Sequence, residues 1–308
     1  MLAVITKALA FVFIILIGYR LKKTGFFAPA DYRLISKIVM NITLPGAIIS
    51  SFAHFKMDYS LFVLAGLGIV ANALMVGAAL LVTRRETPAA KIFYVFGMSG
   101  YNIGNFTLPF VQSFLGPFGV IALCMFDLGN SIMCTGLTYA FTASVVGTAD
   151  GRREPVSMRG IVDKLLHSAP FLVYITLVTL ILLKISLPAQ VYDFAAILGS
   201  ANTFLSMLMI GMMFELNLNK RNIAYIREIV CGRYMAGLTA AFLLLYFQPF
   251  VHEVNVVAAA ALMAPSTAIG PIFIEKMGGN AALAGVVNSL TIMCSVVIFV
   301  LFFTVLHI

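Results

Sequence analysis

Polar side chains inside otherwise apolar runs are the residues of this chain that could do chemistry. Asp127 is the acidic residue that lies clearly inside such a run, and Asn130 follows three positions later, on the same helical face. A carboxylate in a membrane costs free energy and is a functional candidate by default. It could bind a cation, carry a proton or hold amide partners. A purely structural hydrogen bond is the alternative.

Two apolar runs are interrupted by residues that disfavour a regular helix. One reads Gly-Met-Ser-Gly-Tyr-Asn-Ile-Gly-Asn-Phe-Thr-Leu-Pro from Gly97 to Pro109, and the other reads Ala-Pro-Ser-Thr-Ala-Ile-Gly-Pro from Ala264 to Pro271. Glycine is conformationally permissive and proline removes a backbone donor. Broken spans at matching places in two halves indicate a transporter site. The alternative is two kinked helices that pack through small residues.

We predict that Pro109 and Pro265 mark two breaks that face each other at mid-membrane. Freed N–H groups and positive helix ends would bind an anion there without a lysine or arginine. No basic residue is expected deep in any span, so the helix ends must supply most of the positive potential. The candidate substrate-binding residues are Asn102, Asn105, Pro109, Asn130, Pro265, Ser266, Thr267, Asn288, Asn41 and Pro45. Asp127 is the candidate for proton or cation coupling.

The elements that must position these residues are ten apolar runs. The chain is 61% hydrophobic and 10% charged, whereas a soluble domain carries about 25% charge. A membrane-spanning helix needs roughly 20 apolar residues. The predicted spans are 3–20, 34–53, 61–83, 92–114, 117–146, 167–187, 192–214, 223–247, 253–274 and 280–305. These features predict an all-α integral membrane protein in a lipid bilayer.

The basic residues alternate between loops. All of the 20 lysines and arginines except Lys7, Lys56 and Lys184 lie at or near the odd-numbered loops, Arg233 being counted with the seventh. Cytoplasmic loops carry the excess of positive charge, so both termini are predicted to lie outside the cytoplasm. This distribution also argues that the net charge of +8 does not serve nucleic-acid binding.

The chain divides into two halves of five spans. We expect a first repeat at 1–147, a cytoplasmic linker at 148–166 and a second repeat at 167–308. An odd number of spans per half makes the second half inverted, which is a common transporter plan. Asn130-Ser131 and Asn288-Ser289 occupy the fifth and tenth spans and support the repeat.

Motifs of other functional classes are missing from the sequence. It holds no H-E-x-x-H, Walker A or Gly-x-Ser-x-Gly motif, and its four cysteines lack metal-binding spacing. We therefore expect neither an enzyme nor a metal site, and no cofactor beyond a coupling ion, Na⁺ or H⁺, whose identity the residue types leave open.

On these residues the chain resembles the auxin efflux carrier family, whose bacterial members are often called malate or malonate permeases. The matching motifs are Asn41 to Pro45, Asn102-x-x-Asn105-x-x-x-Pro109, Asp127-Leu-Gly-Asn130, and Ala264-Pro265-Ser266 before Pro271. They occur in this order over essentially the whole length. The seventh span departs from the family, because Phe204 lies near where a proline is expected.

The resemblance implies a fold like that of sodium/proton antiporters and bile acid symporters, with broken fourth and ninth helices that cross at mid-membrane. It implies a scaffold of helices one, two, six and seven, and a mobile unit of helices three to five and eight to ten. That unit would carry substrate in an elevator motion, within a homodimer in the bacterial inner membrane.

The function expected from these features is secondary transport of small organic anions, such as malate, malonate or auxin-like acids. One alternative is a sodium-coupled symporter of the bile acid type, with Asp127 and nearby oxygens as cation ligands. The other is a membrane receptor that binds a ligand without moving it. Flux into proteoliposomes separates a carrier from a receptor.

Overall fold

The computed structural model describes residues 2–53, 55, 59–153, 158–214 and 222–306, and every regular element in this part of the chain is helical. Residues 154–157 of the predicted linker and the basic residues Lys56, Lys220 and Arg221 lie outside the described residues. The all-α expectation is confirmed.

A helix or pair of helices lies at each predicted apolar run. The first five runs correspond to α1 (Leu2–Lys23), α2 (Tyr32–Ile38) with α3 (Leu44–Ser51), α4 (Phe62–Val82), α5 (Pro88–Met98) with the start of α6 (Leu108–Ile132), and the rest of α6 with α7 (Thr138–Val145). The other five correspond to α9 (Ala169–Leu182), α10 (Ala189–Ser200) with α11 (Asn202–Met213), α12 (Ile223–Phe247), α13 (His252–Leu262) with α14 (Gly270–Lys276), and α15 (Ala281–Val305).

Several of these helices could cross a bilayer. Six helical segments within the described residues are long and apolar enough, by length and composition, to do so. One of them, Pro88–Val145, has 58 residues, more than twice what a crossing needs. It bends at Gly116, which has non-helical angles (φ 64°, ψ −159°) directly before Pro117. The helices are therefore those of an integral membrane protein, and the plan of ten spans in two inverted halves stays a prediction.

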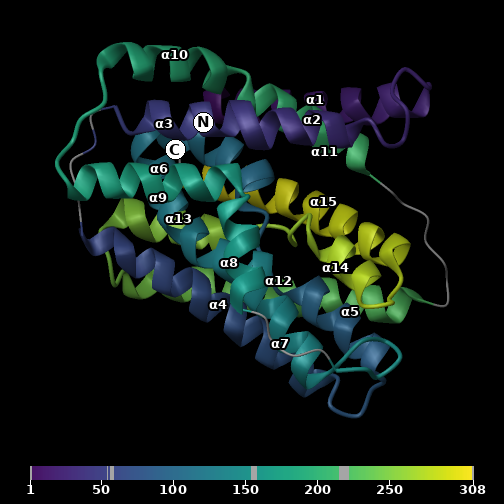
Figure 1. The fold of residues 1–308 in the computed structure, drawn as a ribbon. Coiled ribbons are helices and arrows are strands. Elements are labelled where there is room, and N and C mark those ends of the chain that lie inside the picture. The colour runs from purple at the N-terminus through teal and green to yellow at the C-terminus, as the bar shows by residue number, and fades with distance from the viewer. Residues whose placement is uncertain (1, 54, 56–58, 154–157, 215–221, 307–308) are drawn as a thin grey trace.

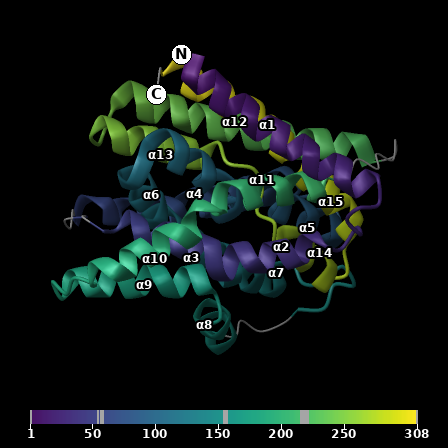
Figure 2. The same cartoon turned by 90° about the horizontal axis from the view of Figure 1, so that it is seen from above.

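The helices form two groups of close packing. In one group α1 packs along α11, and α3 packs along α10 and α9. In the other, α4 packs along α6, α6 along α13, and α13 along α12. Figure 2 shows α9, α10 and α3 together at one edge of the bundle, with α12 and α13 on the far side. The start of α1 and the end of α15 lie close together in Figures 1 and 2.

Two predicted segments differ from what the apolar pattern suggested. The predicted linker contains the helix α8 (Met158–Leu166), whose Ile161 and Leu165 are buried against Ala140 and Phe171. The second run contains a π-helical turn, η1 (Val39–Thr43), directly before Pro45. Figure 2 shows α8 at the edge of the bundle beside α9.

Candidate functional site

The fourth predicted span breaks between α5 and a π-helical turn, η3 (Ile103–Thr107), that leads into α6. Ser99 is extended, and Gly100 has φ +76°, a left-handed conformation that glycine adopts without steric cost. We call residues 99–102 the first break. Pro109 does not mark it, contrary to our prediction: the chain is helical again from Ile103, and Pro109 comes just after the π-helical turn η3.

Two asparagines hold the backbone of the first break. Asn130 of α6 accepts from the N–H of Tyr101 (3.1 Å) and donates to the carbonyl of the same residue (2.9 Å). Asn72 of α4 accepts from the N–H of Gly100 (2.8 Å) and donates to Asn130 Oδ1 (3.1 Å). Both asparagines are buried. Their amides supply the hydrogen bonds that an interrupted helix lacks.

Asp127 holds one of these two asparagines in place. Its Oδ1 accepts from Asn130 Nδ2 (2.8 Å), and its Oδ2 accepts from the hydroxyl of Tyr174 in α9 (2.9 Å). Asp127 is 7% exposed and Tyr174 is fully buried. Both oxygens of the carboxyl group are therefore occupied by hydrogen bonds. Asp127 is therefore connected, through Asn130, to the backbone of the first break.

The ninth predicted span breaks between α13 and α14. Helix α13 ends at Leu262, and Pro265 cannot continue it because it has no N–H and restricts the residue before it. We call residues 263–269 the second break. In this break the N–H and the hydroxyl of Ser266 both bond to Thr291 Oγ1 of α15 (3.2 and 2.9 Å). The same hydroxyl also donates to Asn288 Oδ1 (3.4 Å). The hydroxyl of Ser295 donates to the carbonyl of Met263 (2.8 Å).

The two breaks meet in the buried middle of the protein. The N–H of Asn102 donates to the carbonyl of Pro265 (2.9 Å). A Cβ atom on Gly100 would lie 2.5 Å from Cγ2 of Thr267, so the absence of a side chain permits the close approach. The expectation that the broken segments face each other therefore agrees with these contacts, although four of the N–H groups expected to be free already have partners.

A buried arginine joins both breaks, contrary to the expectation that no basic residue lies deep in a span. Arg233 of α12 is 2% exposed and donates to the carbonyl of Met98, at the end of α5. It also donates to the carbonyls of Ala264 (2.9 Å) and Pro265 (3.0 Å), just after α13. Its guanidinium carbon lies 4.8 Å from the ring centre of Tyr101, a cation–π contact.

The charge of Arg233 is matched by helix ends rather than by a carboxylate. Among the described residues the ion pair present is His167–Asp163, at the surface, so no acidic side chain pairs with Arg233. The carboxyl-terminal end of a helix carries roughly −0.5 of an elementary charge. The ends of α5 and α13 together offset about one positive charge, which is why a guanidinium is tolerated here.

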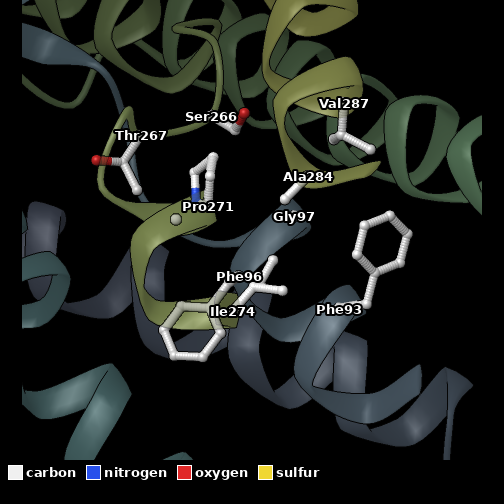
Figure 3. A pocket seen from close by; sticks show the side chains of 10 residues that line it. Phe93, Phe96, Gly97, Ser266, Thr267, Pro271, Ile274, Ala284 and Val287 are labelled. Carbon is white, nitrogen blue, oxygen red and sulfur yellow. The ribbon is translucent and has the colours of Figure 1, made fainter. Parts of the chain in front are cut away.

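A small cavity lies beside the second break. It measures about 10 Å³ and lies between α5, the second break, α14 and α15, and Figure 3 shows Ser266 and Thr267 above Pro271 with Phe93 and Phe96 below. That volume is close to the least that a single water molecule requires. The conformation described here is therefore closed to an organic anion at this point.

The remaining predicted site residues lie at different distances from the breaks. Asn105, on η3, has a side-chain oxygen that is buried and without a hydrogen-bond partner. Pro45 is buried at the start of α3. Its neighbour Leu44 packs against η3, since a Cβ added to Gly104 would lie 2.9 Å from Leu44 Cδ2. Asn41 is exposed and donates to the carbonyl of Lys37 in its own helix (2.8 Å), so it does not join the polar cluster.

Sequence reasoning missed several residues that the structure brings to the site, among them Asn72, Tyr174, Arg233 and Thr291. Two of them carried a usable signal. Asn72 is a lone amide in the apolar run 61–83, and Arg233 lies well inside the predicted span 223–247 although its charge was counted with a loop. Tyr174 and Thr291 look like ordinary residues of a membrane helix, so only their contacts identify them.

Comparison of the sequence with protein-family models and with curated proteins finds no match.

Proposed function

We propose that this chain is a secondary transporter of small organic anions, with carboxylates such as malate, malonate or auxin-like acids as the substrate class, and that it belongs to the auxin efflux carrier family. The observation that carries the proposal is the meeting of two interrupted membrane helices at Asn102 and Pro265. Helix interruptions are expensive in a bilayer and are found where a substrate or ion must be bound.

The charge arrangement favours an anion. Arg233 offsets the negative ends of α5 and α13, as described above. The amino-terminal ends of the same broken spans remain, and these carry positive potential. The buried and unpartnered oxygen of Asn105 lies on the turn that begins one of them. A site that relies on helix ends and a few hydrogen bonds binds weakly, which a carrier needs for release.

Movement by an elevator mechanism would use the two packing groups. The group containing α1, α3, α10 and α11 corresponds to the scaffold expected from the resemblance, and the group containing α4, α6, α12 and α13 corresponds to the mobile unit. The breaks and Arg233 belong to the second group, so they would travel together. A homodimer formed through the scaffold is the assembly we propose with this mechanism.

Asp127 is the residue we propose for coupling. Its carboxyl group accepts a hydrogen bond from Asn130, which holds the first break, and another from Tyr174 of α9, which belongs to the other packing group. A proton or Na⁺ that binds there would change the contacts that hold both. Malonate uptake measured in proteoliposomes with a Na⁺ gradient, with a pH gradient and with neither distinguishes the two ions from uncoupled transport.

Flux and binding of malonate and malate test the proposal. We expect Asn105→Leu to weaken malonate binding about tenfold, measured by calorimetry, while the melting temperature in detergent is unchanged because the lost oxygen has no protein partner. Gln112→Leu is the matched control: it removes another buried, unpartnered oxygen two turns along the same segment and should leave binding intact.

The outcomes separate the functional classes. Saturable uptake that Asn105→Leu impairs supports a carrier that binds its substrate at the breaks. Binding without uptake makes the protein a receptor, and neither binding nor uptake of any carboxylate removes the organic-anion assignment. Orientation is tested separately: a cysteine placed at Gly151 should be labelled only after the cell membrane is permeabilised.

A further inference from the structure

A second pocket lies away from the breaks, where α4 and α7 end and α5 begins. It measures about 400 Å³ and lies between the end of α4, the start of α5, the end of α7 and the first residues of the linker. In Figure 1 the loop from α4 to α5 and the segment after α7 come together at the lower right. The charge pattern of the sequence predicts that this face is cytoplasmic.

Three basic side chains from three separate segments line this pocket. Arg84 follows α4, Lys91 lies in the first turn of α5, and Arg153 comes from the linker. None of them forms an ion pair with an acidic side chain of the described residues. Like charges around one cavity repel, and the positive end of α5 adds to them. The pocket is therefore complementary to an anion.

The other walls of the pocket are apolar. Leu80, Val145 and Val146 line it, so a small hydrated anion would leave much of the surface unused. The neighbouring surface is apolar as well: Leu81 is 68% exposed and Val82 is 62% exposed at the end of α4. A membrane helix exposes such residues to acyl chains, and its end lies at the level of the lipid headgroups. The occupant must combine negative charge with apolar chains.

We propose that this pocket binds the phosphate headgroup of an anionic phospholipid, with Arg84, Lys91 and Arg153 around the phosphate and the acyl chains against Leu80 and Val145. The lipid would join the end of α4 to the start of α5, which leads to Met98 and the first break. Basic pockets at the cytoplasmic ends of membrane helices suit such headgroups. The site is independent of the transported substrate.

The test measures binding of dioleoyl-phosphatidylglycerol to the purified full-length protein in detergent, by native mass spectrometry. Dioleoyl-phosphatidylcholine and inorganic phosphate are the comparison ligands. Each basic residue near a membrane surface contributes roughly fivefold to the affinity for an anionic lipid. We expect the variant R84Q/R153Q to bind phosphatidylglycerol roughly 20-fold more weakly than the unmodified protein.

The matched control is R85Q/R152Q. It removes the same charge from adjacent positions that do not line the pocket, so we expect its affinity to change less than threefold. Equal weakening by both variants would mean general attraction to a basic surface and would overturn the proposal. Equally tight binding of phosphatidylcholine, or displacement of the lipid by inorganic phosphate at the same concentration, would overturn it too.

A single variant keeps the test decisive if the double variant fails to fold. Arg153 is exposed, so Arg153→Gln should not disturb folding, and it should lower the affinity for phosphatidylglycerol about fivefold. An unchanged affinity in this variant would contradict the assignment of Arg153 to the headgroup.

Discussion

The two breaks have similar shapes but are held by different chemistry. The side-chain amides of Asn72 and Asn130 hold the first break, and the buried carboxyl group of Asp127 accepts a hydrogen bond from Asn130. Hydroxyl groups and a guanidinium hold the second: Thr291, Ser295 and Arg233. The acidic group therefore belongs to one half of the chain and the basic group to the other.

The difference indicates a division of work between the halves. A guanidinium stays charged at all physiological pH values, so Arg233 can serve as a permanent anchor for both helix ends. A carboxylate can gain a proton or bind a cation, so Asp127 is suited to a change of state. The anchor reaches across to the first break at Met98, whereas Asp127 reaches α9 through Tyr174. Substitutions on each side can test this division.

The largest effect is expected at the anchor. Arg233→Met leaves the buried carbonyl groups of Met98 and Ala264 without a donor, and each such group costs about 1–3 kcal/mol, whereas the carbonyl of Pro265 keeps the N–H of Asn102. We expect a loss of about 3 kcal/mol or more in the free energy of unfolding, measured as loss of monodisperse protein and a lower melting temperature in detergent. The stability of Arg233→Lys should lie between that of Arg233→Met and that of the unmodified protein.

The control for the anchor is Arg227→Met on the same helix. Arg227 is exposed, so this variant loses a charge and no buried hydrogen bond, and its stability should be unchanged. If Arg233→Met melts at the temperature of the unmodified protein, the helix ends need no guanidinium and the anchor role is wrong.

The second effect is expected at Asp127. Asp127→Asn removes the charge while keeping the size of the side chain, so the protein should fold but transport at least tenfold more slowly. Uptake into proteoliposomes over a range of pH measures this. Asp150→Asn, at an exposed position, is the control. Normal transport by Asp127→Asn at every pH tested would exclude both a proton relay and a cation ligand at this position.

A smaller effect is expected from Tyr174→Phe. The ring stays in place but Asp127 Oδ2 loses its donor, and hydrogen bonds to charged groups contribute roughly 1.5–3 kcal/mol. We expect a lower melting temperature, a few-fold change in transport and a displaced pH profile of uptake. Tyr246→Phe, at a 71% exposed side chain, should change none of these. A variant that loses stability but keeps its pH profile would show that Tyr174 is structural.

The smallest effect is expected from Thr291→Val, which has nearly the same shape. It removes the hydroxyl that bonds the N–H and hydroxyl of Ser266, a neutral interaction worth about 0.5–1.5 kcal/mol. Ser295 still holds the carbonyl of Met263. We expect a slightly lower melting temperature and transport within about twofold of the unmodified protein. A loss of transport as large as that of Asp127→Asn would remove the contrast between the two breaks.

Much of the arrangement was predictable from sequence because hydropathy and backbone chemistry act locally. The apolar runs coincide with helices, since a chain in a bilayer must satisfy its backbone hydrogen bonds within each segment. The first break lies inside the predicted stretch 97–109 and the second overlaps the stretch 264–271, because glycine and proline act on their own neighbours. The pairing of Asp127 with Asn130 followed from helical spacing alone.

The misplaced residues were misread for different reasons. Pro109 looked like a break but lies beyond it, because the chain turns at Gly100 and is helical again from Ile103. Arg233 looked like a loop charge because charge counting ignores depth. Asn41 was predicted to bind substrate, yet its amide donates to a carbonyl of its own helix.

The sequence by itself determined the helical class, the bilayer as solvent, the positions of both interruptions and the presence of one acidic group among them. Each of these follows from properties of neighbouring residues. Only the tertiary structure decided that Arg233 joins two helix ends, that Tyr174 reaches Asp127, and that the second break relies on hydroxyl groups. Those contacts join residues tens of positions or more apart, and their geometry arises only when the helices pack.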